Sequence, residues 1–219
     1  MANVTSIAHV SYLRAQPPVV DAASIAATSF DFYVFSQTWE PYFCTTGNFQ
    51  GCDNPSTFMT NHLTIHGLWP NYNSGSYPSN CGGAALTQSD INSAGASNIA
   101  KYWPDVKTGG WTFVANEWTK HGTCSGLTAP NYLKAAINIE TQLGTPSIIT
   151  NNVGGSVAKS VLVSAYGSGK VALICAGSNN ALSEVRTCYS KAYQQIACPS
   201  SILSADSCSS SKNVRIYTF

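Results

Sequence analysis

The sequence predicts a single α+β domain in which an antiparallel β-sheet packs against several α-helices and disulfides stabilise the fold. Three observations support this fold class. Apolar residues make up 44% of the 219 residues, which is enough to bury one sizeable core. A strand pattern comes early, helical patterns occupy the middle of the chain, and strand patterns return late. The cysteines number eight, an even count without zinc-type spacing, which indicates four disulfides.

The early strand is predicted over residues 30–36, where aromatic and β-branched side chains follow one another. Residues 44–52 begin and end with cysteine and hold two glycines, which suits a short closed loop. A buried strand end is predicted over residues 63–66. Gly67 and Pro70 are expected to break that strand.

Residues 71–83 are rich in Asn, Ser, Gly and Tyr, and they predict an irregular loop before the helices. The first helix is predicted over residues 89–102, because a Trp-Pro pair follows it. The second covers about residues 113–122. The third, over residues 131–143, follows a proline and ends at a glycine. The fourth, over residues 157–166, is expected to begin after a serine cap and to end at a glycine.

Strand patterns return after the helices. Residues 171–175 form an apolar run, whereas residues 184–189 and 213–219 alternate polar and apolar side chains. No repeat or linker indicates a second domain. Residues 1–28 carry no periodicity and contain a Pro-Pro pair, so we expect an N-terminal tail, either a pro-segment or an expression remnant. Residues 29–219 are expected to form the folded domain.

Composition narrows the class of protein. Charged residues make up only 10% of the chain, well below the usual ~25% of globular proteins. The surface must therefore consist largely of Ser, Thr, Asn and Gly, as in many extracellular proteins. A net charge of +1 argues against tight non-specific binding to a polyanion. No segment reaches the ~18 consecutive apolar residues of a membrane span, and the N-terminus lacks the apolar core of a signal peptide. The disulfides and the low charge predict a secreted or extracellular protein or, alternatively, one in a vacuolar or lysosomal lumen. The missing signal-peptide core conflicts with this, so we expect either that the chain begins after a removed leader or that residues 1–28 are a pro-segment or expression remnant.

A polar cluster in residues 113–126 is the most informative feature of the chain. On a helix, Glu117 and His121 lie four residues apart and Lys120 lies three after Glu117, so all three share one face. A second imidazole stands at His66. Two imidazoles can share proton removal and proton donation, and an ammonium can stabilise a phosphate-like centre. This set suits metal-free cleavage of a phosphodiester whose nucleophile is the neighbouring 2′-hydroxyl of RNA.

A plainer interpretation of this cluster is a surface ion pair. Glu117 and Lys120 at i,i+3 spacing would then contribute only a few tenths of a kcal/mol to helix stability. Trp118 and Cys124 lie beside them, which favours a partly buried helix over a solvated one.

Two segments resemble the active-site segments of the ribonuclease T2 family: HGLWP at 66–70 and EWTKHGTC at 117–124. Residues 37–44 and 170–199 are also similar to that family, so the resemblance covers about residues 30–219. It implies a ribonuclease T2-type catalytic domain over residues 29–219. That domain would cleave single-stranded RNA without a cofactor, through a 2′,3′-cyclic phosphate to 3′-phosphate ends.

The resemblance also implies a role for each catalytic residue. His121 would be the general base on the 2′-hydroxyl, and His66 would be the general acid for the 5′-leaving oxygen. Glu117 and Lys120 would stabilise the transition state. Many members of the family carry a phosphate-holding histidine directly before the glutamate. Asn116 stands there in this chain, and it can donate a hydrogen bond but carries no charge.

The resemblance places a base-binding site on each side of the scissile bond. Trp69, Asn71 and Tyr77 would bind one base. Phe113 and Gln37 would bind the other. The same resemblance implies the disulfide pairs Cys44–Cys52, Cys81–Cys124, Cys175–Cys208 and Cys188–Cys198.

Two other functions are open alternatives on the sequence alone. A binding or signalling protein could reuse the scaffold, although both histidines are present. A metal-dependent phosphodiesterase would need clustered carboxylates, and those of this chain are few and unclustered. Single-stranded RNA is therefore the expected partner. A monomer is expected, with no metal, no membrane association and no obligate protein partner.

Overall fold

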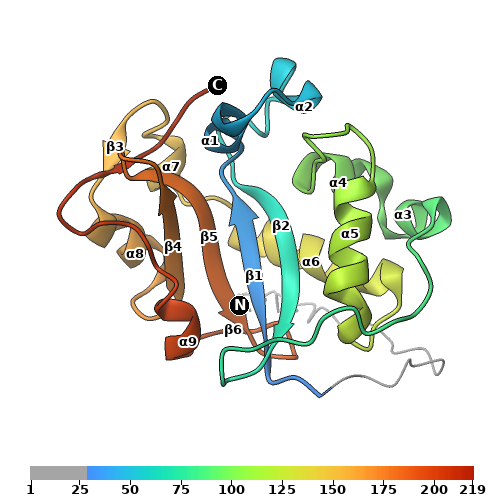
Figure 1. Cartoon of the computed structure of the whole chain (residues 1–219). Coiled ribbons are helices and arrows are strands. Elements are labelled where there is room, and N and C mark those ends of the chain that lie inside the picture. The colour runs from blue at the N-terminus through green and yellow to red at the C-terminus, as the bar shows by residue number, and fades with distance from the viewer. Residues whose placement is uncertain (1–28) are drawn as a thin grey trace, which may run out of the picture.

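Four long strands form the centre of the sheet: β1 (Phe32–Thr38), β2 (Thr64–Asn71), β4 (Val171–Ala176) and β5 (Ala181–Tyr189). The computed structural model describes residues 29–219, so the tail predicted over residues 1–28 lies outside the described residues. β1 pairs antiparallel with both β2 and β5, and β5 also pairs antiparallel with β4. The prediction of an α+β fold with an antiparallel sheet is confirmed (Figure 1).

Three two-residue strands extend the sheet: β3 (Ser156–Val157), β6 (Gln195–Ile196) and β7 (Val214–Arg215). β6 pairs antiparallel with β5, β7 pairs parallel with β5, and β3 pairs antiparallel with β7. The strand predicted over residues 213–219 is therefore much shorter than expected. In the order β2-β1-β5-β7-β3, β2 is an edge strand, which leaves one side of it open to the helices beside it.

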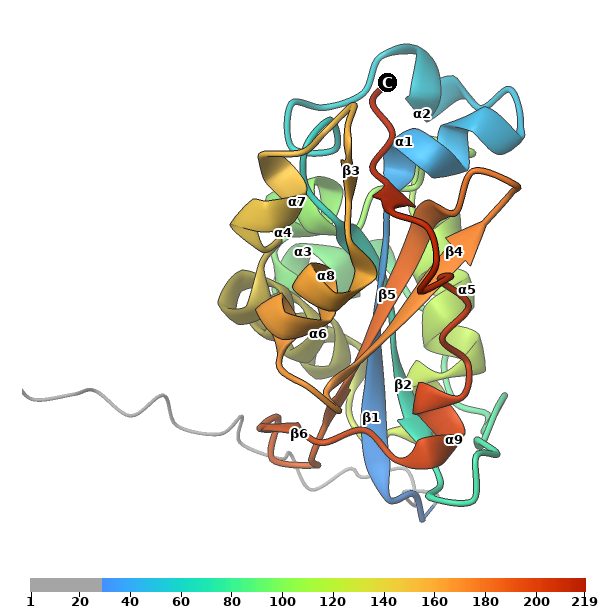
Figure 2. The same ribbon diagram turned by 90° about the vertical axis from the view of Figure 1, so that its left-hand side faces the viewer.

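The longer helices are α3 (Gln88–Ala94), α4 (Ala96–Tyr102), α5 (Thr112–Lys120), α6 (Ala129–Leu143) and α8 (Lys159–Tyr166). The shorter ones are α1 (Glu40–Phe43), η1 (Cys44–Thr46), α2 (Gln50–Asp53), η2 (Gly122–Cys124), α7 (Ser147–Thr150) and α9 (Ser200–Leu203). Figure 2 shows α3, α4, α6, α7 and α8 on one face of the sheet, with α5 and α9 on the other side. None of the helices within residues 29–219 is long and apolar enough to cross a membrane.

The main core lies between the sheet and α6. Phe35 of β1 and Ile65 of β2 are fully buried there against Tyr132 and Leu133. A second cluster, under α7 and α8, buries Trp39, Leu162 and the β4 and β5 side chains that face the same way. The opposite face of the sheet carries a third, smaller apolar cluster that includes Phe32, Val34, Cys188 and Ile202. Further along β1 and β5, the side chains on that face are polar: Ser36, Thr38, Glu184 and Arg186.

Two predicted elements differ from the structure for local backbone reasons. The helix predicted over residues 89–102 is two helices, because Gly95 adopts a left-handed conformation (φ 102°) that ends α3 and begins α4. The serine cap predicted for the fourth helix is wrong. Ser156 belongs to β3, and α8 begins at Lys159.

The breakers predicted at Gly67 and Pro70 do not break the strand, since β2 runs through both. Pro70 pairs with Tyr33. A proline has no N–H to donate, which an edge strand tolerates and a central strand does not. The position of β2 at the edge therefore explains why Pro70 is accommodated.

Four disulfides connect the eight cysteines as the family resemblance implies: Cys44–Cys52, Cys81–Cys124, Cys175–Cys208 and Cys188–Cys198. The Cys81–Cys124 bridge holds the segment next to His121. It ties the loop that carries Tyr77 to η2, directly after His121, across 43 residues of sequence.

Candidate active site

A β-bulge in β2 presents His66. The register passes from Ser36 opposite Gly67 to Gln37 opposite Ile65, so His66 is the extra residue and has no partner on β1. A bulge bends its strand and re-aims the side chain that it carries. The carbonyl of His66 accepts a hydrogen bond of 3.0 Å from the indole Nε1 of Trp103, which fixes the bulge from the helical side.

Helix α5 brings Glu117 to the bulge. The N-terminus of α5 is anchored by buried Asp105, whose carboxylate accepts from the backbone N–H of Phe113 at 2.9 Å. One turn further on, Glu117 Oε2 accepts 2.7 Å from the indole Nε1 of Trp69, and Glu117 Oε1 lies 3.8 Å from His66 Nε2. Burial raises the pKa of Glu117, and this rise is opposed by His66, the Trp69 hydrogen bond and Lys120.

His121 caps the C-terminus of α5. Its backbone N–H donates to the carbonyl of Glu117 at 2.9 Å, and its side chain is buried. Its imidazole Nδ1 is buried with no hydrogen-bond partner among the described residues. Burial, with the charges of Lys120 and His66 added, lowers the pKa of His121 to about 3. This imidazole is therefore neutral at ordinary pH and able to accept a proton.

The environment of His66 has the opposite effect. Its Nδ1 lies 3.3 Å from Glu184 Oε2. Burial alone would lower the pKa of His66, but the hydrogen bond and charge of Glu184, with the charge of Glu117, outweigh burial and raise it. The two imidazoles thus have pKa values that are pushed apart, which is the arrangement needed for one acid and one base.

The indole of Trp69 contacts both imidazoles. Its ring centroid is 5.0 Å from that of His66 and 5.3 Å from that of His121. Tyr77, 48% exposed, has its ring centroid 5.6 Å from that of His121, and Lys120 Nζ is 5.8 Å from the centroid of the Tyr77 ring. An exposed aromatic ring beside a cation is a suitable surface for a stacked base.

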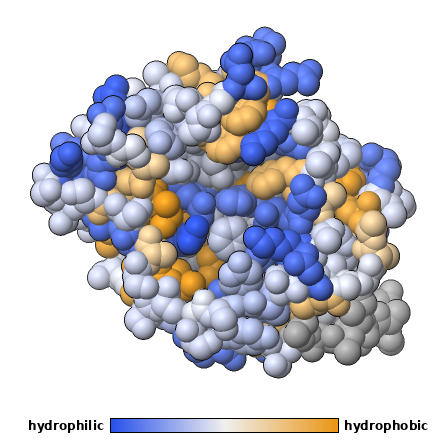
Figure 3. All heavy atoms as spheres, in the orientation of Figure 1, coloured by the Kyte–Doolittle hydropathy of each residue, from blue (hydrophilic) through white to orange (hydrophobic). Residues whose placement is uncertain are grey.

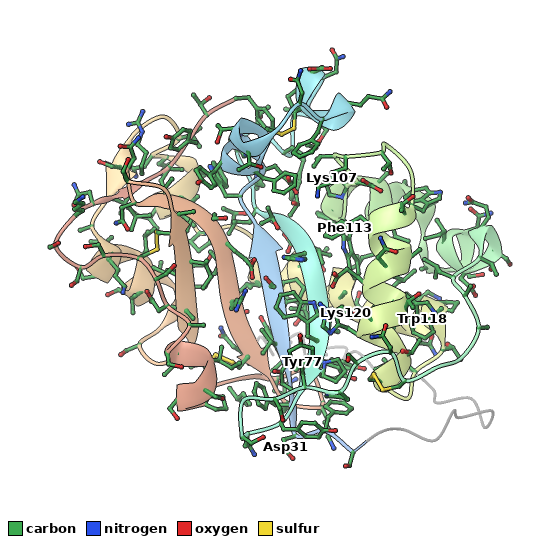
Figure 4. The ribbon with its side chains drawn as sticks, viewed as in Figure 1. Asp31, Tyr77, Lys107, Phe113, Trp118 and Lys120 are labelled. Carbon is green, nitrogen blue, oxygen red and sulfur yellow. A yellow bond between two sulfur atoms is a disulfide. The ribbon has the colours of Figure 1, made fainter. Side chains whose placement is uncertain are left out.

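A cavity of about 410 Å³ lies beside His66. Its lining includes Phe113 and Asn116 from α5 and Glu184 from β5, together with Thr38, Glu40, Phe43, Asp105, Val106, Lys107, Thr108, Thr112 and Ser183. Figure 4 shows Tyr77, Lys120, Phe113 and Lys107 following one another along the line between the sheet and α5, with Trp118 on the opposite side of that helix. Figure 3 shows hydrophilic residues gathered across the middle of the same face.

Two predicted base contacts are placed differently from expectation. Gln37 is fully buried, and its Nε2 donates 2.8 Å to Glu140 Oε2 of α6, behind the sheet. Side chains alternate along a strand, so Thr38, not Gln37, faces the cavity. Asn71 is 4% exposed, and its Nδ2 donates to the carbonyl of Trp69, so it supports β2 from within.

The sequence analysis did not identify Glu184 and Arg186 of β5. Ser36 and Thr38 of β1 lie opposite Arg186 and Glu184, so all four side chains face His66. Glu184 accepts hydrogen bonds from Ser36 Oγ and from Arg186 Nε, the latter at 2.6 Å. The alternating pattern of 184–189 did show that positions 184 and 186 share a face, but no local signal connects that face with His66, which lies 118 residues before Glu184.

No group of three or more His, Cys, Asp or Glu side chains in the part of the chain that the structure describes could hold a metal ion.

The chain is similar in sequence and in structure to known ribonucleases. The model of the ribonuclease T2 family matches residues 30–198. In tomato (Solanum lycopersicum), extracellular ribonuclease LE is 39% identical over 132 residues, and intracellular ribonuclease LX is 35% identical over 123 residues. These matches cover 57% and 54% of this chain, and the chain spans about half the length of these relatives (56% and 51%). The solved structure of RNase NT in complex with 5′-AMP is 26% identical with a TM-score of 0.67, covering 88% of this chain and all of that one (100%).

Proposed function

Because the chain belongs to the ribonuclease T2 family, we propose that it is an endoribonuclease that cleaves single-stranded RNA without a metal ion. The observation that carries the proposal is a pair of imidazoles, His66 and His121, that both contact Trp69 and whose pKa values are shifted in opposite directions. Residues 29–219 would be the catalytic domain.

In the first step, neutral His121 removes the proton of a 2′-hydroxyl, and the 2′-oxygen attacks the adjacent phosphorus. The bond from phosphorus to the 5′-oxygen breaks, and His66 donates its Nε2 proton to that leaving oxygen. The products are a 2′,3′-cyclic phosphate and a free 5′-hydroxyl. Two differently tuned imidazoles support this assignment, since the base must be neutral and the acid must be protonated at the same pH.

In the second step, water attacks the cyclic phosphate and the two histidines exchange roles, which leaves a 3′-phosphate. Lys120 is the compact positive charge for the non-bridging oxygens. Glu117 supports the same phosphoryl group and is held in place by its bond to Trp69. Asn116 lines the cavity and offers a neutral amide to the phosphate.

The position of the general acid sets the polarity of the bound RNA. His66 must reach the 5′-oxygen of the downstream nucleotide, so the cavity beside His66 is the downstream base site, with Phe113 as its aromatic wall. Tyr77 and Trp69, on the side of His121, form the upstream base site. Gln37 is not part of this proposal because it is buried on the other face of the sheet.

Four disulfides favour an oxidising compartment, so we place the enzyme outside the cell or in a vacuolar or lysosomal lumen. Density-gradient fractionation with an antibody separates these locations from the cytosol. We expect a monomer, which light scattering at micromolar concentration checks.

The deciding experiment is digestion of dinucleoside phosphates in EDTA with product analysis. A 2′,3′-cyclic product that turns slowly into a 3′-phosphate is expected, and His66→Ala and His121→Ala should each remove it while the fold is retained. Intact RNA across pH 4–8 would contradict the proposal. A biological effect that survives loss of both histidines would favour a binding or signalling role for the scaffold.

A further inference from the structure

A closed ring of contacts surrounds His66. Its Nδ1 lies 3.3 Å from Glu184, and its Nε2 lies 3.8 Å from Glu117. Glu117 accepts from the indole of Trp69, whose ring lies 5.4 Å from the guanidinium carbon of Arg186. Arg186 Nε completes the ring with its 2.6 Å bond to Glu184. The two nitrogens of the imidazole therefore face different elements: Nδ1 is within hydrogen-bond distance of Glu184 on β5, and Nε2 faces Glu117 on α5 at a longer distance.

Glu184 is the most strongly held member of this ring. Its side chain is 13% exposed, and its two oxygens accept from three groups: Ser36 Oγ, Arg186 Nε and His66 Nδ1. Ser36 and Arg186 lie opposite each other on β1 and β5, so the hydrogen-bonded strands themselves fix the carboxylate. A carboxylate placed this firmly can orient an imidazole.

We propose that Glu184 is the positioning residue of the general acid: it holds the His66 proton on Nδ1, so that Nε2 carries the proton that is transferred to the leaving oxygen. This inference rests on the proposed function, because it assigns His66 the acid role. The two nitrogens of a histidine are distinct, and the hydrogen bond made by one decides what the other can do. Glu184 lines the cavity beside His66, and in this proposal it acts on the reaction only through that imidazole.

The charges that face His66 come from every element packed against it. They are Glu184 and Arg186 of β5, Glu117 of α5, Glu40 of α1, and His121 at the end of α5. Burial raises the pKa of Glu40 to about 7, so this carboxyl is neutral at acidic pH. Burial also acts on Glu184, but the hydrogen bond and charge of His66, together with Arg186, lower the pKa of Glu184 to about 2. Glu184 is therefore the partner that is ionised throughout the working pH range.

A plainer role for Glu184 would be an ion pair with Arg186 that only stabilises β5. That role would affect every substrate equally and would leave the pH profile unchanged. A positioning role would matter only where the leaving group needs a proton. The two roles are thus separated by changing the leaving group.

The test uses Glu184→Gln, which keeps the size of the side chain and removes its charge. The substrates are a dinucleoside phosphate and its analogue with sulfur in place of the bridging 5′-oxygen, because a thiolate leaves without protonation. On the oxygen substrate we expect kcat to fall by about 10- to 100-fold with KM unchanged within about twofold. On the sulfur analogue the loss should be under about threefold. The alkaline limb of the pH profile should move to lower pH, because His66 loses its proton more easily.

Glu140→Gln is the matched control, since Glu140 is a buried glutamate on the helical side of the same sheet. It should leave both rates and the pH profile unchanged. Ser36→Ala is a second test of the same role, for use if Glu184→Gln does not fold. It removes one support of the carboxylate and should give a smaller loss with the same dependence on the leaving group.

An independent measurement follows the ¹⁵N resonances of the His66 ring in the wild type and in Glu184→Gln. The proton should be on Nδ1 in the neutral wild-type ring and be shared between both nitrogens in the variant. Equal losses on both substrates, or an unchanged ring tautomer, would overturn the positioning role. If the wild type itself leaves RNA intact in EDTA, the proposed function fails instead, which is a separate outcome.

Discussion

The indole Nε1 of Trp69 donates a 2.7 Å hydrogen bond to Glu117 Oε2 and so connects β2 with α5 across 48 residues. The bond holds the ring that contacts both imidazoles and the carboxylate that faces His66. It also depends on the absence of a side chain at Gly67. A Cβ there would overlap Trp69 Nε1 and Glu117 Oε2. The active-site geometry is therefore sensitive to one methyl group.

Gly67→Ala tests this sensitivity. The methyl group should push Trp69 and Glu117 apart and lower kcat/KM on RNA by about 10- to 100-fold, through misplacement of catalytic groups. Gly110→Ala is the control, because a Cβ at Gly110 meets no atom within 4 Å. A Gly67→Ala enzyme with wild-type kinetics would show that this bond does not position the site.

The pH dependence of cleavage follows from the two histidines. His121 must be neutral and its pKa is about 3, whereas His66 must be protonated and its pKa lies above the ordinary value. Activity should therefore rise as pH passes about 3, stay high through mildly acidic pH, and fall as pH rises through the pKa of His66. A profile of kcat/KM from pH 3 to 9 checks this. Lys120→Met should move the acidic limb to higher pH, because the Lys120 charge helps to lower the pKa of His121.

Stability should decrease from acidic to alkaline pH for a different reason. Burial raises the pKa of Glu140 to about 8 and that of Glu40 to about 7, from an ordinary value of 4.5. The folded state then binds more protons than the unfolded state between pH 4.5 and 8, so the free energy of unfolding falls as pH rises across that window. Glu140→Gln should remove the Glu140 part of this decrease, so that the loss of stability from pH 5 to pH 8 is smaller than in the wild type by on the order of 3 kcal/mol. Urea unfolding at both pH values measures the change, and equal changes at the two pH values would contradict it.

Gln37 and Thr38 are neighbours in sequence, but substituting Gln37 should change stability and substituting Thr38 should change base preference. Gln37→Ala removes the partner of buried Glu140 and should cost about 1–3 kcal/mol of stability without changing base preference. Thr38→Ala should change the relative rates on dinucleoside phosphates that differ in the downstream base, with little loss of stability, because Thr38 lines the cavity. A base preference that follows Gln37 and not Thr38 would reverse this assignment.

Tyr77 should contribute to binding of the upstream base by stacking. Tyr77→Ala is expected to cost about 1–3 kcal/mol of transition-state binding on RNA, whereas Tyr77→Phe should keep most of it. Steady-state kinetics on substrates that differ in the upstream base measure the loss. Equal losses in the Ala and Phe variants would indicate that the hydroxyl, not the ring, makes the contact.

Local spacing alone places one half of the candidate site. Glu117, Lys120 and His121 lie within five residues, and the period of α5 brings them to the same end of one helix whatever the rest of the chain does. The even cysteine count indicated four bridges, and the aromatic run near residue 32 indicated a strand that is β1 within a residue or two. These features depend on neighbours in sequence.

Pairing between distant strands decided the other half. The bulge that aims His66, the edge position that admits Pro70, and the approach of Glu184 to His66 all arise from the register of β1 with β2 and β5. A shift of one residue in a strand turns each side chain to the other face, which is why Gln37 lies behind the sheet and Thr38 faces the cavity. The sequence by itself determined the helix of Glu117, Lys120 and His121 and the need for a second histidine. Only the tertiary structure decided which carboxylate orients that histidine, because strand register is set by packing of the whole sheet and not by local spacing.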